Sequence, residues 1–160
     1  MPLLPHLGTM PTVADDVSLD DECFVIGKVT LASGVRVGRR TVLRADQDRI
    51  EIGPRCRFGE EATVHIDPGK PTILGADVVV EDRAVVHGCI LGDAVLVERE
   101  ATVLSGSRVG EGSIIQADAL VAEGKEIPPR SVIGGTPGRV IRQTTDAEVA
   151  DIRRRAREGA

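Results

Sequence analysis

Hydrophobic positions recur every six residues along most of this chain of 160 residues. A small aliphatic residue opens each hexad from Val13 to Ile133, and a second small residue follows four places later, as Cys23 follows Leu19. An α-helix cannot keep this period, because six residues make about 1.7 helical turns. A solenoid of short strands can keep it, with one hexad on each side of a three-sided coil. With three hexads per coil, the pattern predicts an all-β, parallel β-helix of about six to seven coils.

The period breaks at three places, and each break lies beside a candidate functional residue. Extra residues intervene within Arg44–Arg49 and within His65–Ile73, and one residue is missing just after His87. Arg44, His65 and His87 each come directly after the opening residue of a hexad, and these hexads are three apart. The three residues are therefore predicted to lie on one face in successive coils. Neighbouring parallel strands are about 4.8 Å apart. The two imidazoles are therefore close enough to share a metal ion, and the plain alternative is a pair of surface or interface side chains.

The two ends of the chain depart from the repeat. We predict an N-terminal arm over 1–12, the solenoid over 13–138, and a linker and helix over 139–160. Thr145 and Glu148 have the spacing of a capping box, which starts a helix of about three turns. Its apolar positions share one face and are Val149, Ile152 and Ala156. We expect this C-terminal α-helix to pack along the solenoid of its own subunit or of a neighbour.

Composition and charge narrow the class of protein. The chain is 41% hydrophobic but has no Trp or Tyr, so its apolar content is aliphatic and suits short strands. The net charge of -5 argues against nucleic acid or an acidic membrane as a partner. The cysteines Cys23, Cys56 and Cys89 are odd in number and lack metal-type spacing, so we expect buried free thiols. No segment has the pattern of a membrane span or a signal peptide, which predicts a cytoplasmic protein.

Six segments carry residues beyond those that the hexad requires. They are Val25–Val29, Val42–Asp46, Ile50–Gly53, Thr63–His65, Val86–Cys89 and Gly134–Arg142. In combination they resemble the gamma-class carbonic anhydrases and their hexapeptide-repeat relatives, over nearly the whole chain from Pro11. The resemblance implies a left-handed β-helix and a homotrimer. It also implies a zinc or iron ion between subunits, held by three histidines, two from one subunit and one from its neighbour.

The chain departs from the family pattern at the implied metal site. His65 and His87 match two ligands of the family, but Asp82 stands where the third histidine is expected. The residue before it, Glu81, stands where the family commonly has glycine. Aspartate can bind zinc or iron, so the resemblance implies a ligand set of His65, Asp82 and His87. Such a site has one more negative charge than three histidines give, which predicts weaker activation of water.

The resemblance also implies residues that act beside the metal. Arg44 and Asp46 match a family pair at the subunit interface, and a structural salt bridge is the plain alternative for them. Gly59 and Glu60 replace the glutamine and aspartate that the family usually has. The candidate catalytic residues are therefore Arg44, Asp46 and Glu60.

Three functions remain open from the sequence. The leading hypothesis is a trimeric gamma-class carbonic-anhydrase-like protein with an altered metal site, a small-molecule substrate at the subunit interface, and CO2 as the default electrophile. The second is a relative that hydrolyses an acyl thioester or another metabolite. The third is a catalytically silent trimer. A hexapeptide acyltransferase is less favoured, because no long external loop interrupts the repeat.

Overall fold

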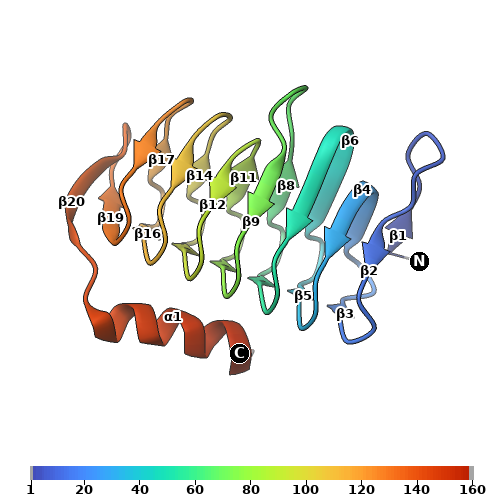
Figure 1. Cartoon of the computed structure of the whole chain (residues 1–160), viewed down its shortest axis with the longest axis horizontal. Coiled ribbons are helices and arrows are strands. Elements are labelled where there is room, and N and C mark those ends of the chain that lie inside the picture. The colour runs from blue at the N-terminus through green and yellow to red at the C-terminus, as the bar shows by residue number, and fades with distance from the viewer. Residues whose placement is uncertain (1, 159–160) are drawn as a thin grey trace.

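The chain folds into a parallel β-solenoid with one helix along its side. The computed structural model describes residues 2–158, which form about seven left-handed coils followed by the helix α1 (Asp146–Glu158). Figure 1 shows the coils stacked along the long axis of the molecule, with α1 running back beneath them from the last coils toward the first. The predicted fold class is confirmed, including the C-terminal helix.

Each coil contributes a strand to each of three faces. The histidine face contains β1 (Leu3–Leu4), the first halves of β4 (Phe24–Leu31) and β6 (Val42–Ile52), β8 (Thr63–His65), β11 (Val85–His87), β14 (Thr102–Val103) and β17 (Leu120–Val121). The open face contains β2 (Thr12–Val13), the second halves of β4 and β6, β9 (Thr72–Leu74), β12 (Ile90–Leu91), β15 (Arg108–Val109) and β18 (Glu126–Ile127). The helix face contains β3 (Ser18–Leu19), β5 (Arg36–Val37), β7 (Arg57–Phe58), β10 (Val79–Val80), β13 (Leu96–Val97), β16 (Ile114–Ile115), β19 (Ser131–Gly134) and β20 (Arg139–Gln143).

The repeating aliphatic residues fill the inside of the prism. Every hexad-opening residue from Val25 to Val121 is buried. Val13, Leu19 and Ile127 are only partly buried, because they lie in the end coils and are covered from one side only. The second small residue of each hexad fits at a corner where the chain turns. The core that the period predicts is therefore confirmed.

The three cysteines behave as small core residues. Cys23, Cys56 and Cys89 are buried and free, as predicted. Burial raises the pKa of the Cys56 and Cys89 thiols to about 12, so both stay protonated. Within residues 2–158, no helix has the length and apolar character needed to cross a membrane. The cytoplasmic location stays a prediction.

Both ends of the chain lie against the solenoid. Leu3 and Leu4 pair with Val25 and Ile26, so the N-terminal arm docks as the strand β1 on β4. At the other end, β20 folds back and pairs antiparallel with β19, while every other ladder among the named strands is parallel. The division of the chain at residues 12 and 138 stays a prediction.

The helix packs on its own subunit. Ile152 and Ala156 are buried against outward-facing apolar residues of four helix-face strands, namely Val79, Leu96, Ile114 and Val132. The predicted capping box is confirmed: Thr145 N–H donates to Glu148 Oε1 at 2.9 Å, and Glu148 N–H donates to Thr145 Oγ1 at 3.1 Å. This reciprocal pair satisfies backbone donors at the helix start.

A buried carboxylate fastens the C-terminal half of α1. Asp77 is fully buried and pairs with Arg55 at 2.8 Å, Arg153 at 2.9 Å and Arg157 at 3.5 Å. Burial acts to raise the pKa of Asp77, but the three guanidinium groups outweigh it and hold that pKa below its ordinary value. Because two of these arginines belong to α1, one carboxylate links the helix to the coil beneath it.

Candidate functional site

The first break in the repeat lengthens a strand instead of forming a loop. The strand β6 runs through it without interruption. Its register on β4 shifts, because Gly27 lies opposite Ala45 and Val29 lies opposite Ile50. The four residues Asp46–Arg49 therefore lie opposite the single residue Lys28, and the three extra residues bulge from the corner between the histidine and open faces.

The second break forms a tight turn between β8 and β9. Asp67 and Lys70 exchange two backbone hydrogen bonds, and Gly69 takes a left-handed φ of 74° that suits glycine. In Figure 1 the β8–β9 connection and β6 rise above the neighbouring coils. The predicted turn is confirmed, and it returns the Asp67 side chain toward β11.

The two predicted histidines stand side by side. His65 and His87 are paired positions of β8 and β11, and their ring centroids lie 5.0 Å apart in an edge-to-face arrangement. Their side chains are 22% and 27% exposed, so solvent or a ligand reaches both. They line a cleft of about 290 Å³ together with Arg44. The predicted placement of Arg44, His65 and His87 on one face in successive coils is confirmed.

Arg44 and Asp46 both contact the first histidine. The Arg44 Nε–H points at His65 Nε2 from 3.3 Å, and Asp46 Oδ1 lies 3.3 Å from the same nitrogen. Arg44 and Asp46 also pair with each other at 3.4 Å. Burial acts to raise the pKa of Asp46, but the hydrogen bond with His65 and the nearby positive charges outweigh it and lower that pKa. The carboxylate therefore stays ionised and fixes the orientation of the ring.

The second histidine has a partner that sequence reasoning missed. His87 Nε2 lies 3.0 Å from Asp67 Oδ1, and the buried Ser105 hydroxyl donates a hydrogen bond to the other oxygen of Asp67. The bond from Ser105, followed by that from His87, lowers the pKa of Asp67. The only sequence signal was that Asp67 opens the turn within the second break. A search confined to hexad positions overlooks it.

Asp82 lies at a different corner of the coil, between β10 and β11. Its Oδ1 accepts a hydrogen bond from the backbone N–H of Glu60 at 2.8 Å. A Cβ on Gly59 would lie 2.9 Å from the backbone nitrogen of Asp82, so glycine permits this close approach. Asp93 makes the same contact at another corner, between β12 and β13, with the N–H of Ala76 at 2.9 Å. Within one chain, Asp82 therefore closes a turn, and neither it nor Glu60 lines the cleft of the histidines.

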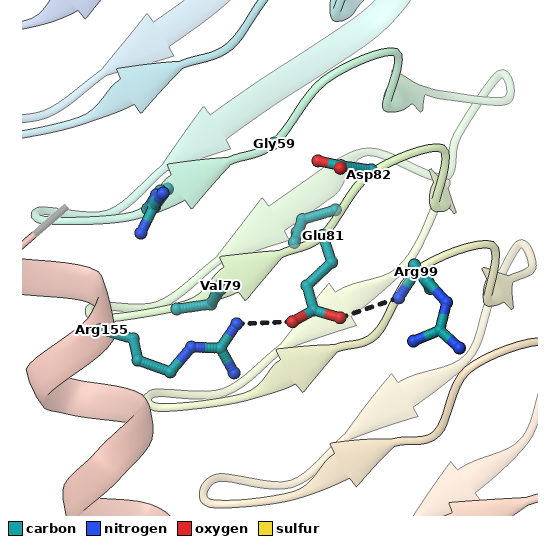
Figure 2. Close-up of a pocket in the computed structure, with 8 residues that line it drawn as sticks. Gly59, Val79, Glu81, Asp82, Arg99 and Arg155 are labelled. Carbon is teal, nitrogen blue, oxygen red and sulfur yellow. Dashed lines mark hydrogen bonds and ion pairs between the residues drawn. The ribbon is translucent and has the colours of Figure 1, made fainter. Parts of the chain in front are cut away.

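Glu81, beside Asp82, joins the helix to this corner. Figure 2 shows its carboxylate between two arginines: one oxygen takes the guanidinium of Arg155 from α1, and the other accepts the backbone N–H of Arg99 at 3.0 Å. This arrangement fixes the Glu81 side chain, which lines one pocket with Asp82. Glu81, which the sequence comparison with the family pattern singled out, thus links the helix α1 to the turn after β13.

One chain by itself brings together two of the three residues that are expected to hold a metal. His65 and His87 offer two nitrogen donors from adjacent strands, which suits zinc or iron. Within residues 2–158, no cluster of three or more His, Cys, Asp or Glu side chains is arranged to hold an ion. The donor set fits a metal only if a neighbouring subunit completes it.

Comparison with known proteins agrees with the fold, although no protein-family model matches the chain. A Methanocaldococcus jannaschii protein named "Probable carbonic anhydrase" is 46% identical over 90% of this chain and 91% of its own length. The mitochondrial gamma carbonic anhydrase 2 of Arabidopsis thaliana is 33% identical over 92% of this chain and 55% of its own length. A structure of a hexapeptide transferase family protein from Anaplasma phagocytophilum superposes with a TM-score of 0.92 at 27% identity, covering 96% of this chain and 91% of that one.

The solenoid and these relatives define a left-handed β-helix protein of the hexapeptide-repeat class. Within that class, the chain belongs to the gamma carbonic anhydrase family.

Proposed function

We propose that the protein is a homotrimer in which His65 and His87 of one subunit and Asp82 of the next hold a zinc or iron ion. The observation that carries the proposal is the register of β8 and β11, which sets the two rings 5.0 Å apart in an accessible cleft. Asp82 is exposed, and its second oxygen is free of any hydrogen bond within the described chain. It is thus available to an ion held by a neighbour.

The outward positions of the histidine face support a second copy of this chain as the partner. Paired positions on six successive strands carry no charge and are Phe24, Val42, Thr63, Val85, Thr102 and Leu120. The equivalent row of the open face includes the charged Glu51, Arg108 and Glu126. An uncharged row beside an incomplete metal site suits a cyclic assembly in which each subunit completes the next.

Each imidazole has a carboxylate that orients it. Asp46 holds His65, and Asp67, itself held by Ser105, holds His87. Such outer contacts fix the ring and tune ligand strength. When bound, zinc or iron would supply Lewis-acid activation of water. With a carboxylate in place of the third imidazole, we expect weak hydration of CO2 at neutral pH.

One observation favours a second candidate, the catalytically silent trimer. Asp82 repeats the turn contact that Asp93 makes far from any histidine. If the carboxylate serves only that contact, no third ligand exists and the assembly is structural. Hydrolysis of an acyl thioester remains the other enzymatic hypothesis, and a substrate comparison separates it from CO2 hydration.

The test combines mass, metal content and activity. Wild-type protein refolded with zinc or iron is expected to scatter light as a trimer and to retain metal, whereas His87→Ala is expected to lose the metal and remain trimeric. His6→Ala removes the remaining histidine, outside the site, and is the matched control. Stopped-flow CO2 hydration and acyl-CoA hydrolysis are then measured on the same samples. A metal-free trimer would support the silent assembly, and a monomer would refute the shared site.

A further inference from the structure

A pocket of about 360 Å³ lies between the Asp82 corner and the helix α1. Three arginines reach it from separate elements: Arg57 from β7, Arg99 from the turn after β13, and Arg155 from α1. Figure 2 shows this arginine pocket, with Glu81 lying between Arg155 and Arg99. The strand β10 (Val79–Val80) also lines it, with the Val79 side chain facing outward and the Val80 side chain inside the prism.

The acidic groups of the arginine pocket are already engaged. Both oxygens of Glu81 are occupied, by the guanidinium of Arg155 and by the backbone N–H of Arg99. One oxygen of Asp82 takes the backbone N–H of Glu60. The remaining guanidinium donors therefore exceed the acceptors that the pocket offers.

Two of the three arginines, Arg57 and Arg99, have no counter-ion bound to the guanidinium within the described chain; Arg99 is exposed, so Arg57 is the half-buried one. Within residues 2–158, the Arg57 guanidinium makes neither a hydrogen bond nor an ion pair. Its strand partner on β5 is another cation, Arg36, which donates to the carbonyl of Arg157.

Burial lowers the pKa of Arg57, and repulsion from Arg155 and Arg36 lowers it further. Asp82 and Glu81 act in the opposite direction without outweighing these effects, and neither forms an ion pair with Arg57. A half-buried guanidinium that lacks a paired anion is unfavourable, so an added anion would stabilise it.

We infer that the arginine pocket binds a small oxyanion, a phosphate or a carboxylate, through the guanidinium of Arg57 with Arg155 beside it. The planar fork of a guanidinium pairs with two oxygens of such a group. The volume matches the lower range of small-molecule sites, and the outward-facing Val79 gives the pocket an apolar side. The inference concerns a single subunit and does not require the proposed metal.

The test measures binding of inorganic phosphate and of acetate to the full chain at constant ionic strength. Calorimetry and the 15N resonance of the Arg57 Nε–H report on the same titration, with and without zinc. We expect saturable binding with a dissociation constant of about 1 mM or tighter. The probe that binds more tightly then shows whether the site prefers a phosphate or a carboxylate.

Variants distinguish a specific anion site at Arg57 from unspecific attraction of anions to positive charge. Arg57→Gln is expected to weaken binding by about tenfold or more, because a charge-assisted pair is lost. Arg57→Lys keeps the charge but loses the fork, so an intermediate effect is expected. Arg108→Gln removes an exposed arginine on the open face and is expected to bind like the wild type.

Three results would overturn the inference. One is the absence of saturable binding of either probe to the wild type. Another is equal weakening in Arg57→Gln and Arg108→Gln, which would mean unspecific attraction. The last is a pair of results: Arg57→Gln no longer forms the trimer, and the wild type binds neither phosphate nor acetate. This pair would mean that the Arg57 guanidinium contacts a partner subunit. Since binding is followed without metal, these results are distinct from failure of the proposed metal site.

Discussion

The carboxylate of Asp82 closes the turn at Glu60 one coil below it, through a hydrogen bond of 2.8 Å from the Glu60 backbone N–H. This contact leaves one oxygen of Asp82 free within the described chain and places it away from the cleft of its own histidines. Its role as a metal ligand therefore depends on a neighbouring subunit. The contact also means that a change at Asp82 affects the local turn as well as the metal.

Asp82→His is predicted to tighten metal binding, because imidazole replaces a carboxylate that partly neutralises the ion. Full recovery of CO2 hydration is not expected, because Glu81 and Glu60 leave the surroundings unlike the family's, and outer contacts alone change affinity or activity about 10–100-fold. Elemental analysis and stopped-flow hydration measure both effects. Robust hydration by the wild type would refute the view that Asp82 impairs the chemistry.

A matched pair isolates the metal role of Asp82 from its turn contact. Asp82→Asn and Asp93→Asn alter equivalent backbone contacts and are each expected to cost about 1 kcal/mol of unfolding free energy. Only Asp82→Asn is expected to lower metal content. Equal metal content in the two variants would show that Asp82 has a structural role alone.

Asp67→Asn is predicted to weaken zinc binding by about 10–100-fold, because His87 loses the carboxylate that orients its ring. Competition titration with a zinc chelator measures the affinity directly. Asp118→Asn changes an exposed carboxylate in a later coil and serves as the control. If both variants bind zinc like the wild type, Asp67 does not act on the metal site.

Val85→Arg is predicted to dissociate the trimer. Val85 faces outward on the histidine face between Thr63 and Thr102, so an arginine there would place unpaired charge in the proposed interface. Ile90→Arg makes the same change on the open face and is expected to remain trimeric. Light scattering distinguishes the two, and a wild type with the mass of a monomer would contradict the assembly.

Val109→Asp is predicted to destabilise the protein by about 3–5 kcal/mol, because it buries an unpaired charge inside the prism. The neighbouring Arg108 points outward and is exposed, so Arg108→Asp is expected to change stability by about 0.5 kcal/mol or less. Chemical denaturation measures both. A soluble Val109→Asp protein with an unchanged unfolding midpoint would show that the hexad frame is wrong.

Asp77→Asn is predicted to loosen α1 and to lower the unfolding free energy by about 2 kcal/mol near neutral pH. Asparagine tolerates the left-handed φ of 59° at this position, so the change removes charge with little backbone strain. The pKa of Asp77 is lowered on folding. Its contribution is therefore present above the ordinary carboxyl pKa of about 3.9 and declines as the pH falls below that value.

The pH dependence checks the assignment of that stability to Asp77. The difference in unfolding free energy between wild type and Asp77→Asn is expected to shrink on going from neutral pH to about pH 3. Asp151→Asn alters an exposed helix carboxylate and should show no such difference. A constant difference across the titration would contradict the proposed link.

The sequence alone determined the solenoid and the position of its paired histidines. The aliphatic opening residue and the small corner residue are local requirements that every coil repeats, so the period assigns each position to a face. The same arithmetic set His65 against His87, because strands one coil apart pair in register. Functional residues at regular positions of the repeat could therefore be located from the sequence alone.

Only the tertiary structure decided what surrounds those side chains. Asp67 reaches His87 because of the shape of the turn that the insertion forms. Asp82 accepts a hydrogen bond from the Glu60 N–H, which belongs to the preceding coil. The bond between Glu81 and Arg155 joins residues 74 positions apart and depends on how α1 docks. None of these contacts follows the six-residue period, because inserted turns and a docked helix obey local backbone geometry and side-chain reach rather than the repeat.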